Sequence, residues 1–300
     1  MFLIIPEAGH YAMYVAVAMI AYMILGASWD LLYSYTGQLS LGQALAFGLG
    51  GLFTGFPLFE FGLSPYLSIV IGCLAACGIQ GVVGITTIRL KPAYQGIATL
   101  LFAQVLYYVM QILYGTEGIS PYLPGFIGKA GAVSFSTIYY IGVVIFIFAG
   151  TAIFALERSK YAVRLLAIAS DPIAAETLGI NVTLNKLIIW FTSSFFAGLA
   201  GAFYTVALLH LDYNIFGVTN DFLPITASII GGVGTIIGPL IGGLIVGGVL
   251  TILPVWFSFA LTLLAYGVIL LVVARFFPSG LMGVTRFRRE KIDLQTKRRE

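Results

Sequence analysis

The sequence predicts an all-α polytopic membrane protein with about eight hydrophobic segments, one of them broken or re-entrant. Of its 300 residues, 60% are hydrophobic and 9% are charged, whereas soluble domains carry about 25% charged residues. So few charges cannot cover a soluble surface, and lipid must therefore surround most of the exterior. The apolar runs reach the roughly 20 residues that a helix needs to cross the hydrocarbon core. They are too long for the strands of a barrel, which have about 10 residues.

The first part of the chain is predicted to form uninterrupted spans, because backbone groups in lipid must be satisfied within a helix. These spans cover residues 11–34, 41–57, 64–88, 94–114, 136–156 and 187–209. The next apolar stretch, 222–253, is too long for a single span and contains IIGGVGTIIGPLIGG at 229–243. Its glycines and Pro239 favour a broken element that enters through 222–231, turns at a non-helical tip and returns through 240–253. A last span at 255–275 then crosses the membrane.

The basic residues predict which side of the membrane each loop faces. Apart from Lys129, every lysine and arginine follows the third, the fifth or the last of the spans. Cytoplasmic loops carry an excess of such residues, so the chain is expected in the cell membrane with its N-terminus outside and its C-terminus in the cytoplasm. The opposite loops hold Glu60, Glu117, Asp212 and Asp221, which suits the outside.

The chain lacks the residue patterns of an enzyme or a metalloprotein. Cys73 and Cys77 are its only cysteines, and a pair of thiols without a nearby histidine or carboxylate makes a poor metal site. The stretch GFIGKAG around Lys129 is not a P-loop, because Ala130 stands where Ser or Thr should follow the lysine. No metal, cofactor or nucleic-acid partner is therefore expected for this chain itself.

The candidates for a translocation pathway are uncharged polar residues and glycines. They are Gln38, Ser40, Gln43, Thr99, Gln104, Gly231, Gly232 and Gly234. Exposed backbone at a glycine tip can offer N–H and C=O groups to a passing solute. The alternative is that these residues serve plain helix packing. Asp30 is the one charged candidate within a span and has no obvious partner, and a transporter without ion-coupling residues must take its energy from elsewhere.

A short helix is predicted in the polar connection 157–186, within ASDPIAAETLGIN at 169–181. Asp171 can act as its N-cap, with Pro172 as the first helical residue, where the missing N–H costs nothing. Gly179 supplies a left-handed stop, and a helix this short is marginal alone in water. An ordinary surface loop with a helical turn is one interpretation. The other is a docking helix for a cytoplasmic partner with a groove, with Glu176 facing solvent and the small or apolar residues in contact: Ile173, Ala174, Ala175 and Leu178.

The block IASDPIAAETLGINVTLNKLIIWFTSSFFAGLAGAFY at 168–204 resembles the signature loop and following helix of ABC-transporter permeases for branched-chain amino acids, the LivM-type subunit. Further stretches are similar to the same family: YSYTGQLSLGQALAFGLGG (33–51), IRLKPAYQGIATLLFAQVL (88–106), ASIIGGVGTIIGPLIGG (227–243) and FFPSGLMG (276–283). The resemblance runs from about residue 30 to 285. It departs from the family at RLKPAY, where a Gly or Arg-Gly usually precedes the aromatic residue.

The resemblance implies a transmembrane permease domain over 1–285, with a cytoplasmic coupling loop at 157–186, and a basic cytoplasmic tail at 286–300. It implies a second permease subunit, two cytoplasmic ATPase subunits and an extracytoplasmic substrate-binding protein as partners. ATP and magnesium would bind to the ATPase subunits, and this chain would not itself be an enzyme. The cargo would be leucine, isoleucine, valine or a related hydrophobic amino acid. Another small cargo, such as urea, an amide or a different amino acid, and an ATP-independent carrier or channel are the alternatives.

Overall fold

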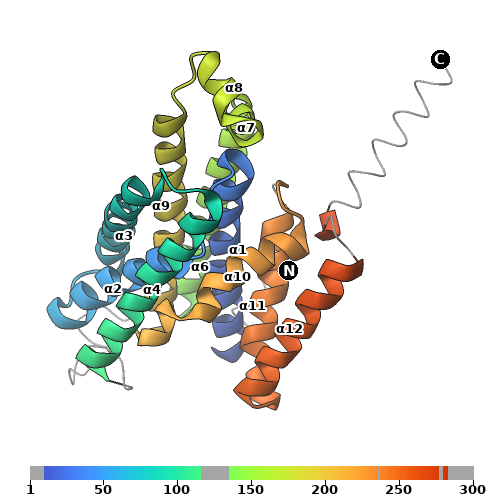
Figure 1. Ribbon diagram of the computed structural model, residues 1–300. Helices are drawn as coiled ribbons and strands as arrows, with labels where there is room; N and C mark the ends of the chain where they lie inside the picture. The colour runs from blue at the N-terminus through green and yellow to red at the C-terminus, as the bar shows by residue number, and fades with distance from the viewer. Residues whose placement is uncertain (1–9, 116–134, 236, 277–279, 283–300) are drawn as a thin grey trace.

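The computed structural model describes residues 10–115, 135–235, 237–276 and 280–282, and Figure 1 shows its helices. The first half of the chain forms α1 (His10–Thr36), α2 (Gln43–Phe61), α3 (Pro65–Thr87), α4 (Pro92–Tyr114) and α6 (Phe135–Glu157). Two short helices, α7 (Lys160–Ser170) and α8 (Pro172–Thr177), precede the long α9 (Val182–Leu208). A 3-10 turn, η2 (Tyr213–Phe216), leads into α10 (Val218–Gly231), α11 (Gly238–Trp256) and α12 (Phe259–Phe276). The predicted basic tail, 286–300, lies outside the described residues.

The prediction of an all-α polytopic membrane fold is confirmed. Seven of the described helices are long and apolar enough to cross a membrane: α1, α2, α3, α4, α6, α9 and α11. A shorter apolar stretch, Ala260–Ile269, lies in α12. The run 222–253 is broken as predicted, since α10 ends at Gly231 and α11 begins at Gly238. In Figure 1, α10 and α11 form a hairpin whose tip points toward the end of the molecule that carries α7 and α8.

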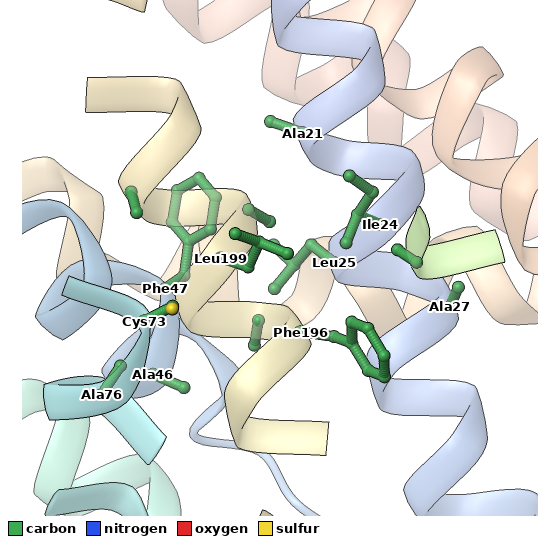
Figure 2. Packing of buried hydrophobic residues seen from close by; sticks show 14 of the residues in the cluster. Ala21, Ile24, Leu25, Ala27, Ala46, Phe47, Cys73, Ala76, Phe196 and Leu199 are labelled. Carbon is green, nitrogen blue, oxygen red and sulfur yellow. The ribbon is translucent and has the colours of Figure 1, made fainter. Parts of the chain in front are cut away.

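The central helix of the bundle is α1, which is buried along most of its length. It packs against α9, α10, α11 and α6, and α9 packs in turn against α2 and α3. Figure 2 shows part of this core, with apolar side chains from α1, α2, α3 and α9: Ala21, Ile24, Leu25, Ala27, Ala46, Phe47, Cys73, Ala76, Phe196 and Leu199. Large apolar side chains on α3, α4 and α12 face outward instead, as a lipid environment requires: Leu74, Val82, Leu101, Ile112, Leu264 and Leu271.

Glycines allow the central helices to approach one another backbone to backbone. A Cβ atom added at Gly201 of α9 would lie 1.8 Å from the carbonyl oxygen of Phe47 on α2. A Cβ atom added at Gly243 of α11 would lie 2.6 Å from the Cα atom of Met23 on α1. Small residues at these crossings are therefore a condition of the close packing on which helix association in lipid depends.

The helices α7 and α8 lie together at one end of the bundle, beside the end of α1 and the start of α9 (Figure 1). The side chain of Ser159 caps α7 by accepting the backbone N–H of Ala162 at 3.3 Å. The buried face of α7 carries Ala162, Leu165 and Ile168, and α7 packs against both α1 and α8. The position of α8 is thus fixed, through α7, to the central helix.

Candidate functional site

The short helix α8 begins and ends as the sequence predicts. The Oδ1 atom of Asp171 accepts the backbone N–H groups of Ile173 at 2.9 Å and Ala174 at 3.1 Å, and Pro172 is the first helical residue. At the other end, the N–H of Ile180 donates to the carbonyl of Ala175 at 3.1 Å, and the N–H of Gly179 donates to that of Glu176 at 2.9 Å. Gly179 has a φ of +81°. This is the hydrogen-bond pattern of a Schellman stop, which satisfies carbonyls that the helix leaves free.

The residues expected to form one docking surface divide between two faces of α8. Ile173 and Leu178 are 76% and 78% exposed, whereas Ala175 is 2% exposed and packs against the protein itself. The inward position of Ala175 differs from the expectation of a partner contact, because two helical steps turn a side chain through about 200° from Ile173. Pro172, Ala174, Glu176 and Gly179 are exposed with the outward face.

The six residues between α1 and α2, Gly37 to Gly42, form a largely buried non-helical segment, here called the first interruption. The indole N–H of Trp29 on α1 donates to the carbonyl of Ser40 at 2.7 Å. The N–H of Leu41 donates to the hydroxyl of Thr99 on α4 at 3.1 Å, and the side-chain amide of Gln80 on α3 donates to the carbonyl of Gly42 at 3.3 Å. Groups from α1, α3 and α4 therefore satisfy this irregular backbone, as burial at membrane depth requires.

Gln43 begins α2 and joins it to two neighbouring helices. Its Nε2 atom donates to the hydroxyls of Ser28 on α1 and Ser193 on α9, at 3.0 Å in each case. The hydroxyl of Ser193 donates in turn to the carbonyl of Ser28 at 2.7 Å. All these side chains are buried, so Gln43 serves as a polar link between α1, α2 and α9 in this conformation.

The segment between α10 and α11, described at residues 232–235 and 237, is the second interruption. Gly232 and Gly234 have φ values of +116° and +73°, a region that favours glycine. Asp30 on α1 accepts the N–H of Gly234 at 3.1 Å through Oδ1 and at 3.3 Å through Oδ2. The hydroxyl of Ser34 also donates to Oδ1, at 3.0 Å. The partner that Asp30 lacks in the sequence is therefore a backbone amide of the glycine tip.

The prediction that Asp221 lies in an outer loop is wrong. α10 begins at Val218, before the start of the predicted span, so Asp221 falls in its first turn and its side chain is fully buried at 0% exposure. Its Oδ1 atom accepts the N–H of Ala44 at 2.9 Å, and its Oδ2 atom lies 3.5 Å from the side-chain amide of Gln104. One carboxylate thus joins α10 to the start of α2 and to α4.

The comparison with known families decides the class of protein. The family model of the branched-chain amino acid transport system / permease component matches residues 11–274. The chain belongs to this family. The match includes α8 and both interruptions, and it confirms the resemblance seen in the sequence.

Three relatives of this permease show how far the similarity extends. It is 29% identical over 289 residues to the probable branched-chain amino acid transport permease protein LivH of Methanocaldococcus jannaschii, covering 87% of this chain and 88% of that protein. It is 22% identical to the permease protein LivM of Salmonella typhimurium, over 91% of this chain and 70% of that one. It is also 27% identical to the guanosine ABC transporter permease protein NupQ of Bacillus subtilis, over 56% of this chain and 57% of that one. No solved structure matches.

The permease gathers the predicted pathway residues around its two interruptions. Gln38, Ser40, Gln43 and Thr99 lie in or beside the first, and Gln104 reaches Asp221 near the start of α2. Gly231, Gly232 and Gly234 form the approach and the turn of the second. Gly231 also serves packing, since a Cβ atom there would lie 1.7 Å from the carbonyl oxygen of Gly238. Two consecutive residues of α1 contact the two interruptions. Trp29 hydrogen-bonds to the first, and Asp30 hydrogen-bonds to the second.

Several polar contacts of the permease interior were not predicted from the sequence. Gln80 and Trp190 link α3 and α9, with the indole N–H donating to the carbonyl of Gln80 at 2.8 Å. Ser28 and Ser193 complete the contacts of Gln43. In the sequence, the only signal for these contacts is the spacing of polar residues along separate helices. Across the described residues, no group of three or more His, Cys, Asp or Glu could hold a metal ion.

Proposed function

We propose that this permease carries branched-chain amino acids across the cell membrane, driven by ATP hydrolysis on separate subunits. An extracytoplasmic binding protein would deliver the cargo, and a second permease subunit would complete the membrane part. Two cytoplasmic ATPase subunits would hold ATP and magnesium, and α8 of this chain would bind in a groove on one of them. The N-terminus would lie outside and the C-terminus in the cytoplasm, with the basic connections 89–91 and 158–186 on the cytoplasmic side.

The observation that carries the proposal is the outward face of α8. A six-residue helix is too short to be stable alone, yet α8 is capped at both ends and anchored through the buried Ala175. Figure 1 shows α8 at one end of the bundle, and Ile173 and Leu178 on this helix are not covered by any described part of the chain. Two large apolar side chains on a rigid helix are suited to a hydrophobic groove on a partner. An ATPase subunit is the partner that an ABC permease requires.

The buried carboxyl groups also favour an external source of energy. Asp30 and Asp221 each accept a backbone N–H from another part of the fold. Intramembrane carboxyls that relay ions or protons commonly face a cavity or pair with other ionisable groups. In the described interior these two act instead as hydrogen-bond acceptors for the backbone, which supports coupling to an ATPase over coupling to an ion gradient.

The cargo assignment rests on the relatives and on the chemistry of the interruptions. The similarity to LivH covers more of this chain than the similarity to NupQ, which favours an amino acid over a nucleoside. A branched-chain amino acid is a zwitterion with an apolar side chain, and strong fixed charges along its route would trap it. At the first interruption, Gln38, Ser40 and Thr99 provide amide and hydroxyl groups without net charge, and the nearby carboxyl groups of Asp221 and Asp30 are each bound to a backbone N–H.

The test is ATP-dependent import into proteoliposomes that contain the permease with its second permease subunit, the ATPase subunits and the binding protein. Labelled leucine, guanosine and urea would be compared, with a non-hydrolysable ATP analogue as the control. We expect leucine import that requires hydrolysable ATP. Import of guanosine or urea without leucine would overturn the cargo assignment. Leucine uptake that is independent of ATP would identify a carrier or channel instead.

A further inference from the structure

Each interruption of the permease is held by a carboxylate from the helix that leads into the other interruption. The first interruption follows α1, and α1 carries Asp30, which accepts the N–H of Gly234 in the second. The second interruption follows α10, and α10 carries Asp221, which accepts the N–H of Ala44 in the first turn of α2, two residues after the first interruption. The two hydrogen bonds therefore form a reciprocal pair that joins segments 204 and 177 positions apart in the sequence.

The two helices that carry these carboxylates also pack against each other. The hydroxyl of Ser228 on α10 donates to the carbonyl of Gly26 on α1 at 3.3 Å. A Cβ atom at Gly26 would lie 3.1 Å from the Cβ atom of Ala227, so the helices are in contact at this point. Each carboxylate hydrogen bond joins one helix of this pair to the segment that follows the other helix. A displacement of α1 relative to α10 would therefore disturb both hydrogen bonds.

Each carboxylate satisfies a backbone donor that the local sequence leaves without a side-chain acceptor. Gly42 is the N-cap of α2 and has no side chain to cap it, so Asp221 supplies from α10 the oxygen that an N-cap residue normally supplies. Gly234 lies in a left-handed turn. Its N–H donates to the carboxylate of Asp30 and not to a backbone carbonyl of a helix. Asp30 and Asp221 are 3% and 0% exposed, and burying a carboxylate is costly unless it is well hydrogen-bonded. Such costly groups within a membrane bundle are commonly functional.

We propose that Asp30 and Asp221 are positioning residues that couple the two interruptions, so that one interruption cannot change position without shifting the other. The inference rests on the proposed ATP-driven transport, in which motion enters at α8. From α8 the packing continues through α7 to α1, and α1 carries Trp29 and Asp30 to the two interruptions. The carboxylates thus convert a movement of α1 into a joint movement of α2 and of the α10–α11 tip.

The test compares Asp30→Leu and Asp221→Leu, alone and together, with Asp30→Asn and Asp221→Asn in the assembled transporter. The Asn variants keep an oxygen that can accept the same N–H, and the amide of Gln104 can rotate to suit an amide in place of the Asp221 carboxylate. We expect each Leu variant to lower import per ATP hydrolysed about tenfold, while ATP hydrolysis continues. The double Leu variant should be no worse than the poorer single variant, because both bonds belong to one link.

A reporter at the distant interruption separates coupling from local structure. With Cys73 and Cys77 replaced by Ala, Val233→Cys would report on the second interruption when Asp221 is changed to Asn or Leu. Leu39→Cys would report on the first interruption when Asp30 is changed. Coupling predicts that Asp221→Leu alters thiol labelling at Val233→Cys, although Asp221 does not bind that segment, and that Asp221→Asn does so less.

Unchanged labelling at both distant reporters, or normal import per ATP in both Leu variants, would overturn the inference. Additive losses in the double variant would also contradict it. These outcomes differ from the outcomes that would contradict the proposed transport function. If the wild-type transporter imports leucine but the reporters do not respond, the coupling is wrong and the function stands. If the reporters respond in membranes but no ATP-dependent import occurs, the coupling stands and the proposed function is wrong.

Discussion

Ile173 and Ala175 lie two residues apart on α8 and face opposite ways, with 76% of one side chain exposed and 2% of the other. The buried methyl group of Ala175 holds the helix against the permease, and Ile173 is thereby presented to a partner. The short helix α8 thus separates an anchoring role from a docking role. This division gives different expectations for residues that adjoin one another in the sequence.

Ile173→Ser and Leu178→Ser should each weaken binding of the ATPase subunits. Loss of an apolar anchor buried in a groove costs on the order of 2 kcal/mol, or about 30-fold in affinity. The measurement is the retention of ATPase subunits on the purified permease as salt and detergent are varied. Glu176→Gln on the same exposed surface is the matched control and should retain them. Equal retention in all three variants would place the ATPase contact elsewhere.

Ala175→Arg should damage the permease itself before it affects docking. The side chain of Ala175 is buried within the chain, and a bulky charge there costs several kcal/mol unless the local structure opens. We expect a lower yield of folded permease and a lower unfolding temperature in the absence of any partner. Ala174→Arg, at the exposed neighbouring position, is the control and should fold normally. A normal unfolding temperature for Ala175→Arg would show that this face is not an anchor.

Alanine at two glycines near the second interruption should have different consequences. At Gly231 the added Cβ would lie 1.7 Å from the carbonyl oxygen of Gly238, and overpacking of this kind costs about 1–3 kcal/mol. At Gly234 the nearest neighbour of a Cβ is the hydroxyl of Ser34 at 3.7 Å, so the cost comes from the left-handed φ and is about 1–2 kcal/mol. Gly231→Ala should therefore reduce folding and assembly, measured as the yield of intact transporter, more than Gly234→Ala does. Equal yields of the two variants would contradict the packing role of Gly231.

The larger variant Gly234→Leu probes the proposed pathway, because its side chain would project from an exposed turn. We expect assembly and ATP hydrolysis to persist while import falls. Gly234→Asn, which tolerates the left-handed conformation better, is the control for strain. A failure of Gly234→Leu to assemble would mean that the turn serves packing, and the pathway would have to be sought on other faces.

Single cysteines at Ser170 and Ser64 should report the orientation of the permease. Both serines are exposed, and they lie at the end of α7 and directly before α3. With Cys73 and Cys77 replaced by Ala, Ser170→Cys should react only with reagents that enter the cytoplasm. Ser64→Cys should react from outside in intact cells. The reverse pattern would invert the proposed topology and remove the ATPase from reach of α8.

The features that sequence reasoning predicts well are those that short stretches determine. The caps of α8 depend on Asp171, Pro172 and Gly179, which are neighbours in the chain, and each acts in the structure as its chemistry indicates. The break before α11 follows from the local run of glycines and Pro239. In each case the physical cause lies within a few residues.

The features that sequence reasoning missed depend on distant partners or on rotation about a helix. Asp221 is predicted in a loop because the sequence does not reveal its hydrogen-bond partner. That partner, the N–H of Ala44, lies 177 positions away. Asp30 has no evident partner for the same reason, since Gly234 lies 204 positions away. The inward turn of Ala175 requires knowledge of where α7 and α9 lie, because a small apolar residue fits an inner or an outer face equally well.

Cysteine cross-linking from α8 would show whether energy enters this permease at that helix. Ile173→Cys and Leu178→Cys would be placed in a permease without Cys73 and Cys77 and treated with a short thiol-to-amine cross-linker in membranes that contain the ATPase subunits. We expect an adduct of the permease with an ATPase subunit from both positions, and none from Ser64→Cys. Two outcomes would contradict the entry of energy at α8. One is an adduct from Ser64→Cys, and the other is the absence of adducts from Ile173→Cys and Leu178→Cys while the transporter imports leucine.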